Sequence, residues 1–138
     1  MAITQAMCTS FKSEILQEGH QLATDTIKIA LYTSTASLDA TTTAYSSSNE
    51  VSGTGYTATG VTLTSTTVAL SGTTAYFDAD DPTWTSASFT ARGALIFNAS
   101  NSNKAIAVLD FGGDFTVAGG TFKITLPAAG TTAIIRIA

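Results

Sequence analysis

Apolar and polar residues alternate along most of the chain after its first 25 residues. In the run 26–32, the alternation places Ile27, Ile29 and Leu31 on one face of a half-buried strand. Turn-forming residues separate this run from the later ones, so each predicts a short strand. The later runs lie at 61–64, 68–70, 74–78, 83–85, 89–91, 93–97, 105–111, 121–126 and 133–137.

A different period marks the start of the chain. Met7, Phe11 and Ile15 recur every four residues, which predicts an amphipathic α-helix within residues 1–19. Thr4 is the expected N-cap and Gly19 the residue that ends the helix.

These elements predict a single domain, 1–138, with the helix in 1–19 and strands throughout 26–138. The fold class is mainly β: an antiparallel β-sandwich or open barrel of about eight strands with one N-terminal α-helix. The two most apolar runs, 93–97 and 105–111, flank a turn-rich connector. They are expected to form a central hairpin that is buried on both faces.

Charged residues make up 12% of the chain, about half the usual share of roughly 25%. Two interpretations stay open. The protein is a low-charge β-domain, secreted or thermally tough, or it packs against copies of itself or a large partner, where buried charge is costly.

The charge pattern argues against nucleic acid as a partner. The net charge is −4, and the six basic residues are scattered singly. The start of the chain lacks the pattern of a signal peptide, and no run approaches the roughly 20 apolar residues of a membrane span. We therefore expect a protein made in the cytoplasm that does not enter a membrane.

Residue types needed for catalysis and metal binding are scarce. With one histidine, one cysteine and no Gly-x-Ser-x-Gly motif, we predict no catalytic residues, no metal site and no cofactor. Cys8 is expected to be a buried thiol, and His20 to face the helix dipole. Asp78, Asp80 and Asp81 are hard-cation ligand types, and whether they bind a cation stays open.

The glycine-rich stretch 49–61 is the most distinctive segment. A phosphate loop would follow a strand and precede a helix, whereas here a strand follows, so nucleotide binding is not expected. Glycines allow close approach of another backbone, and tyrosine is a frequent interface anchor. Two uses remain: packing on the protein's own sheet edge, or contact with a neighbouring subunit. The candidate contact residues are Glu50, Val51, Gly53, Gly55, Tyr56, Gly60 and Trp84.

A short N-terminal helix, the alternating strand 27–32 and the segment 49–56 leading into 61–63 together resemble a group of small virion proteins of tailed bacteriophages. The segments 91–98 and 105–112 resemble the same group, so the similarity spans most of the chain. The resemblance implies a non-enzymatic particle component, such as a head decoration or cement protein on the capsid surface. It also implies a homo-oligomer, expected to be a trimer, with the major capsid protein or another virion protein as partner.

Two alternatives stay open. One is a neck, tail or fibre-associated virion component. The other is a carbohydrate-binding module that stacks sugars on exposed Trp84, Tyr45 or Tyr56.

Overall fold

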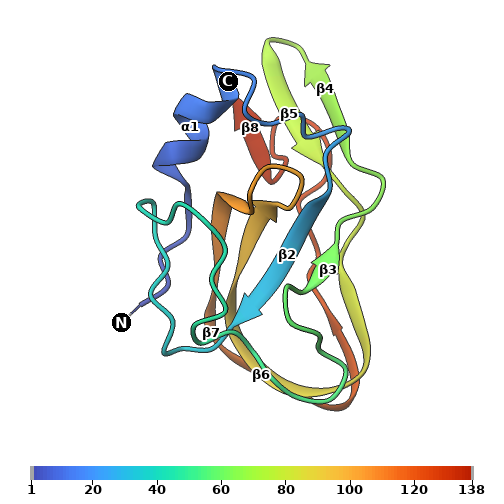
Figure 1. Ribbon diagram of the computed structural model, residues 1–138. Helices are drawn as coiled ribbons and strands as arrows, with labels where there is room; N and C mark the ends of the chain where they lie inside the picture. Colours follow the sequence, from blue (N-terminus) through green and yellow to red (C-terminus); the bar gives the residue numbers. More distant parts are fainter. Residues whose placement is uncertain (1, 138) are drawn as a thin grey trace.

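The computed structural model describes residues 2–137 and is built from two antiparallel sheets and one short helix (Figure 1). The larger sheet has the order β1-β7-β6-β2-β3, and the smaller one the order β4-β5-β8. The helix α1 spans Thr9–Ile15. The strands are β1 (Ala6–Met7), β2 (Ile27–Tyr32), β3 (Val61–Thr62), β4 (Thr67–Ser71), β5 (Thr74–Asp78), β6 (Thr83–Asn98), β7 (Lys104–Lys123) and β8 (Ile135–Ile137). The predicted fold class is confirmed.

The helix prediction needs correction. Residues 6–7 form β1, which pairs with Ala107 and Val108 of β7, and the helix begins only after Cys8. Thr4 is not its cap, because the N-cap position is occupied by Cys8. The Thr4 N–H instead donates to the Leu38 carbonyl at 2.8 Å. Pairing with β7 satisfies the early backbone groups, so tertiary context overrides the local helical period.

The end of the helix also differs from expectation. Helix α1 ends at Ile15, and the left-handed residue that follows is Glu18, with φ 60°. Gly19 comes one residue later and donates its N–H to the Glu14 carbonyl at 2.7 Å. A Cβ on Gly19 would lie 2.8 Å from that carbonyl oxygen, so the glycine is needed for close approach.

The predicted central hairpin is confirmed and is longer than expected. Strands β6 and β7 pair along their whole length, from Asn98 opposite Lys104 to Thr83 opposite Lys123. The runs 83–85, 89–91 and 93–97, expected as separate strands, form the single strand β6, and 105–111 is continuous with 121–123 in β7. The strands continue through the polar and glycine positions between these runs because β-bulges accommodate the extra residues. Register shifts lie between Trp84 and Ala87, between Ala87 and Ser88, between Ala91 and Gly93, and between Ile96 and Phe97.

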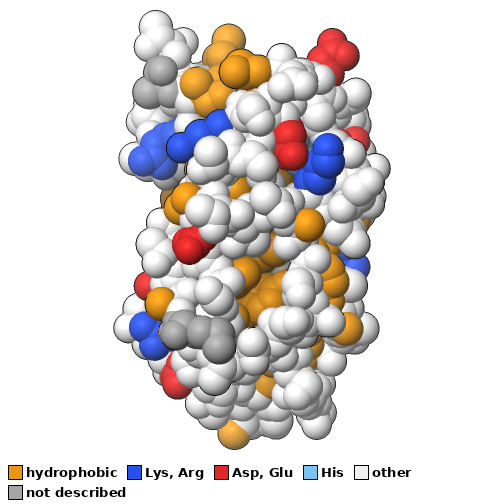
Figure 2. Space-filling model, turned by 60° about the vertical axis from the view of Figure 1, so that its left-hand side comes forward, with side chains coloured by type: hydrophobic (Ala, Val, Ile, Leu, Met, Phe, Trp, Pro, Cys, Tyr) orange, Lys and Arg blue, Asp and Glu red, His pale blue; other side chains and the backbone are white. Residues whose placement is uncertain are grey.

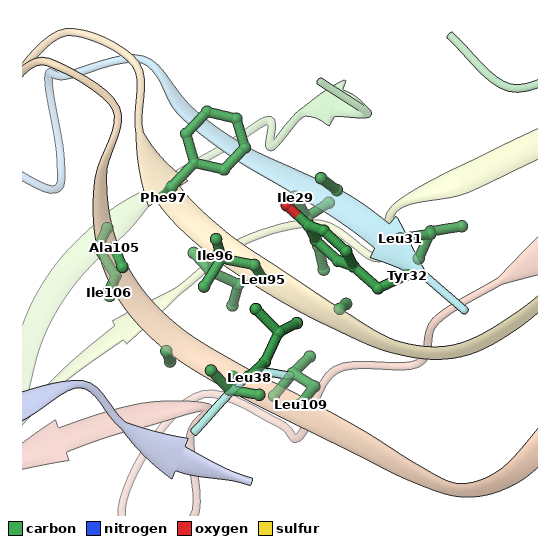
Figure 3. Packing of buried hydrophobic residues seen from close by; sticks show 14 of the residues in the cluster. Ile29, Leu31, Tyr32, Leu38, Leu95, Ile96, Phe97, Ala105, Ile106 and Leu109 are labelled. Carbon is green, nitrogen blue, oxygen red and sulfur yellow. The ribbon is translucent and has the colours of Figure 1, made fainter. Parts of the chain in front are cut away.

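The paired strands β6 and β7, called the β6–β7 ribbon below, have two halves that differ in how many other strands lie beside them. In the near half, residues 93–98 and 104–110, β6 pairs with β2 and β7 pairs with β1. Most side chains of both strands are buried there, as Figure 3 shows for Leu95, Ile96 and Ile106. The far half, residues 83–92 and 111–123, extends beyond β1 and β2.

The smaller sheet and the helix lie at one end of the molecule, close to the C-terminus (Figure 1). Phe77 of β5 and Ile135 of β8 are buried and belong to the main core cluster, so the second sheet shares the core with the first. Leu22, in the loop after the helix, joins the same cluster. One core thus holds both sheets together.

Candidate functional site

The glycine-rich stretch lies against the protein's own sheet. A Cβ on Gly53 would lie 2.5 Å from the Ser88 carbonyl oxygen, and one on Gly60 would lie 1.8 Å from the Ile29 carbonyl oxygen. Thr54 forms a bridge with Ser88, whose N–H donates to the Thr54 carbonyl at 2.9 Å. The segment therefore covers the edge of β6 in the far half of the ribbon, and side chains at these positions would prevent that contact.

Gly55 makes the same kind of approach, since a Cβ there would lie 2.8 Å from the Ala87 Cα. All three glycines also have positive φ: 153° at Gly53, 82° at Gly55 and 76° at Gly60. Of the two uses expected for the stretch, packing on the protein's own sheet edge is confirmed by these close approaches. Its use as a subunit contact stays a prediction.

The carboxylate of Glu50 is the centre of a polar cluster inside this segment. The hydroxyls of Tyr45 and Tyr56 donate to its two oxygens, each at 2.5 Å, and the Thr59 N–H donates at 2.8 Å. Bonds to a charged acceptor are shorter and stronger than neutral ones. One charged side chain therefore pins three points of a long irregular loop.

Tyr56 links this cluster to β2. Its hydroxyl accepts the Leu31 N–H at 2.9 Å while it donates to Glu50. Burial, followed by the Glu50 hydrogen bond, raises the pKa of the Tyr45 hydroxyl to about 12. Burial and the same carboxylate raise the pKa of Tyr56 as well. Both tyrosines are held neutral as donors to Glu50.

Val51 and Trp84 are buried, at 4% and 3% exposure. The Val51 N–H donates to the Leu31 carbonyl at 2.9 Å. Trp84 packs between Tyr56 and Phe122, with ring centroids 6.4 and 5.9 Å apart. A sugar platform requires an exposed ring face, which Trp84 does not present in this fold.

A second polar cluster surrounds His20, whose side chain is fully buried. Its Nε2 lies 2.8 Å from Glu14 Oε1, and its Nδ1 lies 3.0 Å from the amide nitrogen of Asn98. That amide also donates to Asp25 Oδ2 at 2.8 Å, which fixes its orientation. Since the Asn98 amide donates to Nδ1, the proton is on Nε2, and the ring is a neutral link between α1 and β6.

The sequence prediction for His20 did not include these partners. The available signal was Asn98, a polar residue that directly follows the apolar run 93–97. A polar group at the end of a buried strand needs a hydrogen-bond partner, and the histidine supplies it. The pairing joins residues 78 positions apart, so no local pattern could show it.

The three aspartates before Pro82 are partly used by the chain itself. Asp81 Oδ1 accepts the Leu126 N–H at 2.8 Å, and its Oδ2 lies 3.7 Å from Lys123 Nζ. Asp80 Oδ2 accepts the Thr64 hydroxyl at 3.3 Å. Within residues 2–137, no three His, Cys, Asp or Glu side chains form a group suited to a metal ion.

Large hydrophobic side chains reach the surface in two regions. Leu16, Val68, Leu70 and Ile137 are exposed at the end formed by α1 and the smaller sheet, and Leu70 is 75% exposed. Phe115 is 52% exposed in the far half of β7. It lines a groove of about 440 Å³ together with Phe111, Val117 and Phe122. Figure 2 shows hydrophobic side chains gathered in places on one face, with few and scattered charges.

Comparison with family models, curated proteins and solved structures finds no match to this chain. Within residues 2–137, no helix has the length and apolar character needed to cross a membrane.

Proposed function

We propose that this protein is a non-enzymatic structural component of a tailed-bacteriophage particle, most simply a cement or decoration protein on the capsid surface. Its partner is the major capsid protein or another virion protein. The proposal rests on the resemblance of 49–56 leading into 61–63, and of 91–98 and 105–112, to small virion proteins, together with the exposed apolar side chains and low charge of the surface.

The observation that carries the proposal is a contrast between two kinds of side chain: the polar clusters bond within the chain, whereas several large apolar side chains are exposed to solvent. Glu50 and His20 direct their bonds to the chain's own residues. Large hydrophobic side chains such as Leu70 and Phe115 are meanwhile left exposed. Exposed apolar groups on a surface with little charge favour protein–protein contact.

The proposed assembly is a homotrimer, because cement proteins bridge neighbouring capsomers, commonly around three-fold positions. A neck, tail or fibre-associated component is the alternative within the same class. Copy number separates the two, since a cement protein is present in far more copies per particle than a neck or tail protein.

The test is addition of the purified protein to particles that lack it. We expect saturable binding at high copy number, measured by quantitative mass spectrometry, and greater resistance of the particles to heat. Failure to bind any particle component would overturn the proposal. Binding restricted to the neck or tail would overturn the cement role and leave the virion role.

A matched pair of variants on β4 locates the contact. Leu70→Asp places a charge at an exposed apolar position, and Thr67→Asp places the same charge at an exposed polar position of the same strand. We expect Leu70→Asp to weaken particle binding about ten-fold or more and Thr67→Asp to change it little. Both variants should unfold at nearly the wild-type temperature. Equal effects of the two would exclude this surface as the contact.

A further inference from the structure

The far half of β7 has an open edge. Over residues 111–123 its only strand partner within the described chain is β6, because β1 covers just Ala107 and Val108. Alternate residues of such an edge present N–H and C=O groups that another strand can pair with. The apolar groove with Phe115 lies beside this edge.

The sequence along this edge is close to palindromic. Residues 114–117 read Asp-Phe-Thr-Val, and residues 123–120, taken in reverse, read Lys-Phe-Thr-Gly. Between the two halves lie Ala118 and Gly119. The inversion exchanges an acid for a base and preserves the aromatic residue and the threonine.

The faces of the strand agree with this inversion. Phe115 and Val117 lie opposite the buried residues Ala91 and Phe89, and Phe122 lies opposite buried Trp84. These three side chains therefore share the inner face.

The remaining side chains lie on the outer face. Thr116 lies opposite exposed Thr90, with their hydroxyl oxygens 2.8 Å apart, and Lys123 lies opposite exposed Thr83. Alternation places Asp114 and Thr121 on that face too. The bulge at Gly119, φ 64°, provides the shift that keeps inner residues opposite inner ones after inversion.

We propose that two copies of this chain associate by antiparallel pairing of their β7 edges about a two-fold axis beside Ala118 and Gly119. Asp114 then lies opposite the partner's Lys123, and Phe115 opposite the partner's Phe122. Thr116 lies opposite the partner's Thr121. By symmetry each contact occurs twice, and a self-complementary patch of this kind is what a two-fold interface requires.

The charges on the β7 edge favour a second copy of this chain as its partner, because the edge carries both an acidic and a basic side chain, Asp114 and Lys123. Asp114 forms no salt bridge within residues 2–137, and the Lys123 side chain is 55% exposed. Lys123 Nζ is 3.7 Å from Asp81, a distance that leaves it free to turn toward a neighbouring strand. Opposite charges placed directly across a strand pair stabilise it, and like charges destabilise it.

Gly120 supports the same arrangement. Its φ is not in the left-handed region, and a Cβ there would make only ordinary contact, 3.5 Å from Val117 Cγ2. Nothing in the single chain therefore requires glycine at this position. Glycine within a strand often marks the close approach of another chain, and the two-fold arrangement places the partner's Val117 opposite it.

The test is a charge exchange followed by analytical ultracentrifugation of the full chain. Asp114→Lys and Lys123→Asp each place like charges across the interface twice. Each should weaken association by roughly ten-fold or more. The double variant Asp114→Lys/Lys123→Asp restores opposite charges and should recover most of the wild-type affinity. Lys12→Asp, on an exposed position of α1, is the control that changes net charge away from the edge.

Thermal unfolding of each variant under dissociating conditions shows whether the single chain is intact. Gly120→Val provides a second probe, because it is expected to obstruct the partner strand and spare the fold of one chain. A wild-type protein that stays monomeric, or a double variant that fails to recover, would overturn the inference.

The inference is independent of the proposed function. If the protein is a trimer whose association is unchanged by all of these charge substitutions, the two-fold contact is overturned and the virion proposal is kept. If both contacts form, the expected assembly is two trimers joined across β7 edges. If the protein associates through its β7 edges in the charge-dependent way and yet binds no particle, the virion proposal is overturned and the two-fold contact is kept.

Discussion

The near and far halves of the β6–β7 ribbon belong to one hairpin and differ in what surrounds them. The near half has a strand partner on each edge, β2 beside β6 and the short β1 beside Ala107 and Val108 of β7. It is buried on both faces, and Leu95 and Ile96 are fully buried. In the far half, the glycine-rich stretch covers the β6 edge, and no strand among residues 2–137 pairs with the β7 edge. Stability is therefore expected to concentrate in the near half, and association in the far half.

The largest expected effect comes from cutting back one side chain in each half. Leu95→Ala removes a fully buried side chain from the near half and should lower the free energy of unfolding by about 4 kcal/mol. Phe115→Ala removes a larger side chain that is 52% exposed and should cost less than about 1.5 kcal/mol. Urea denaturation measures both. Similar losses would show that the two halves contribute equally.

Glycine substitution gives the next largest contrast. Gly60→Ala brings a Cβ within 1.8 Å of the Ile29 carbonyl oxygen, so the loop must separate from β2, at a cost of about 3 kcal/mol. Gly112, in the far half of β7, also has positive φ, 79°, but a Cβ there meets nothing within 4 Å. Gly112→Ala should therefore cost only about 1 kcal/mol of backbone strain. Chemical denaturation of the two variants tests the difference.

Removal of the Glu50 charge tests the loop that covers the β6 edge. In Glu50→Gln an amide group replaces one acceptor oxygen, so the Thr59 N–H or a tyrosine hydroxyl loses its partner. We expect a loss of about 2 kcal/mol in unfolding free energy and faster hydrogen exchange in residues 50–60. Glu18→Gln, at an exposed position, is the matched control and should change neither quantity. An unchanged Glu50→Gln protein would show that the cluster does not hold the loop.

The smallest effect is a dependence of stability on alkaline pH. Because the pKa of Tyr45 is raised to about 12, the folded protein keeps the phenol proton after the unfolded chain has lost it. The contribution is complete below the ordinary tyrosine pKa of about 10 and is lost as the pH rises through about 12. The melting temperature should fall over this interval. In Tyr45→Phe it should fall less steeply, and an identical slope would contradict the assignment.

Period and turn chemistry in the sequence predicted most of the strands. Strand β5 lies at 74–78 as expected, and β2 differs from its predicted run by one residue. The burial of Cys8 is also confirmed, at 0% exposure. These features depend on local alternation and on residue type, which a sequence displays directly.

The start of the chain shows where local reasoning was insufficient. The four-residue period of Met7, Phe11 and Ile15 predicted a longer helix, but β7 recruits residues 6–7 as a strand. A strand partner 100 residues away supplies hydrogen bonds that the local period cannot reveal. The His20 cluster was missed for the same reason, because His20 and Asn98 are 78 positions apart. The bonds of Glu50 to Tyr45, Tyr56 and Thr59 join residues of one loop, and they were missed because an irregular loop has no regular spacing that brings given side chains together.

By itself, the sequence determined a mainly β domain, its turns, and a glycine-rich segment built for close approach, because these follow from period, backbone freedom and composition. Only the tertiary structure decided which surface the glycines approach and where Glu50 and His20 direct their bonds. Within residues 2–137, it also left the β7 edge of the far half without a strand partner. The surface under the glycines, the His20 bonds and the β7 edge depend on which distant strands lie side by side, and that pairing is set by the packing of the whole chain. The Glu50 bonds depend on the path of one irregular loop, which that packing also sets.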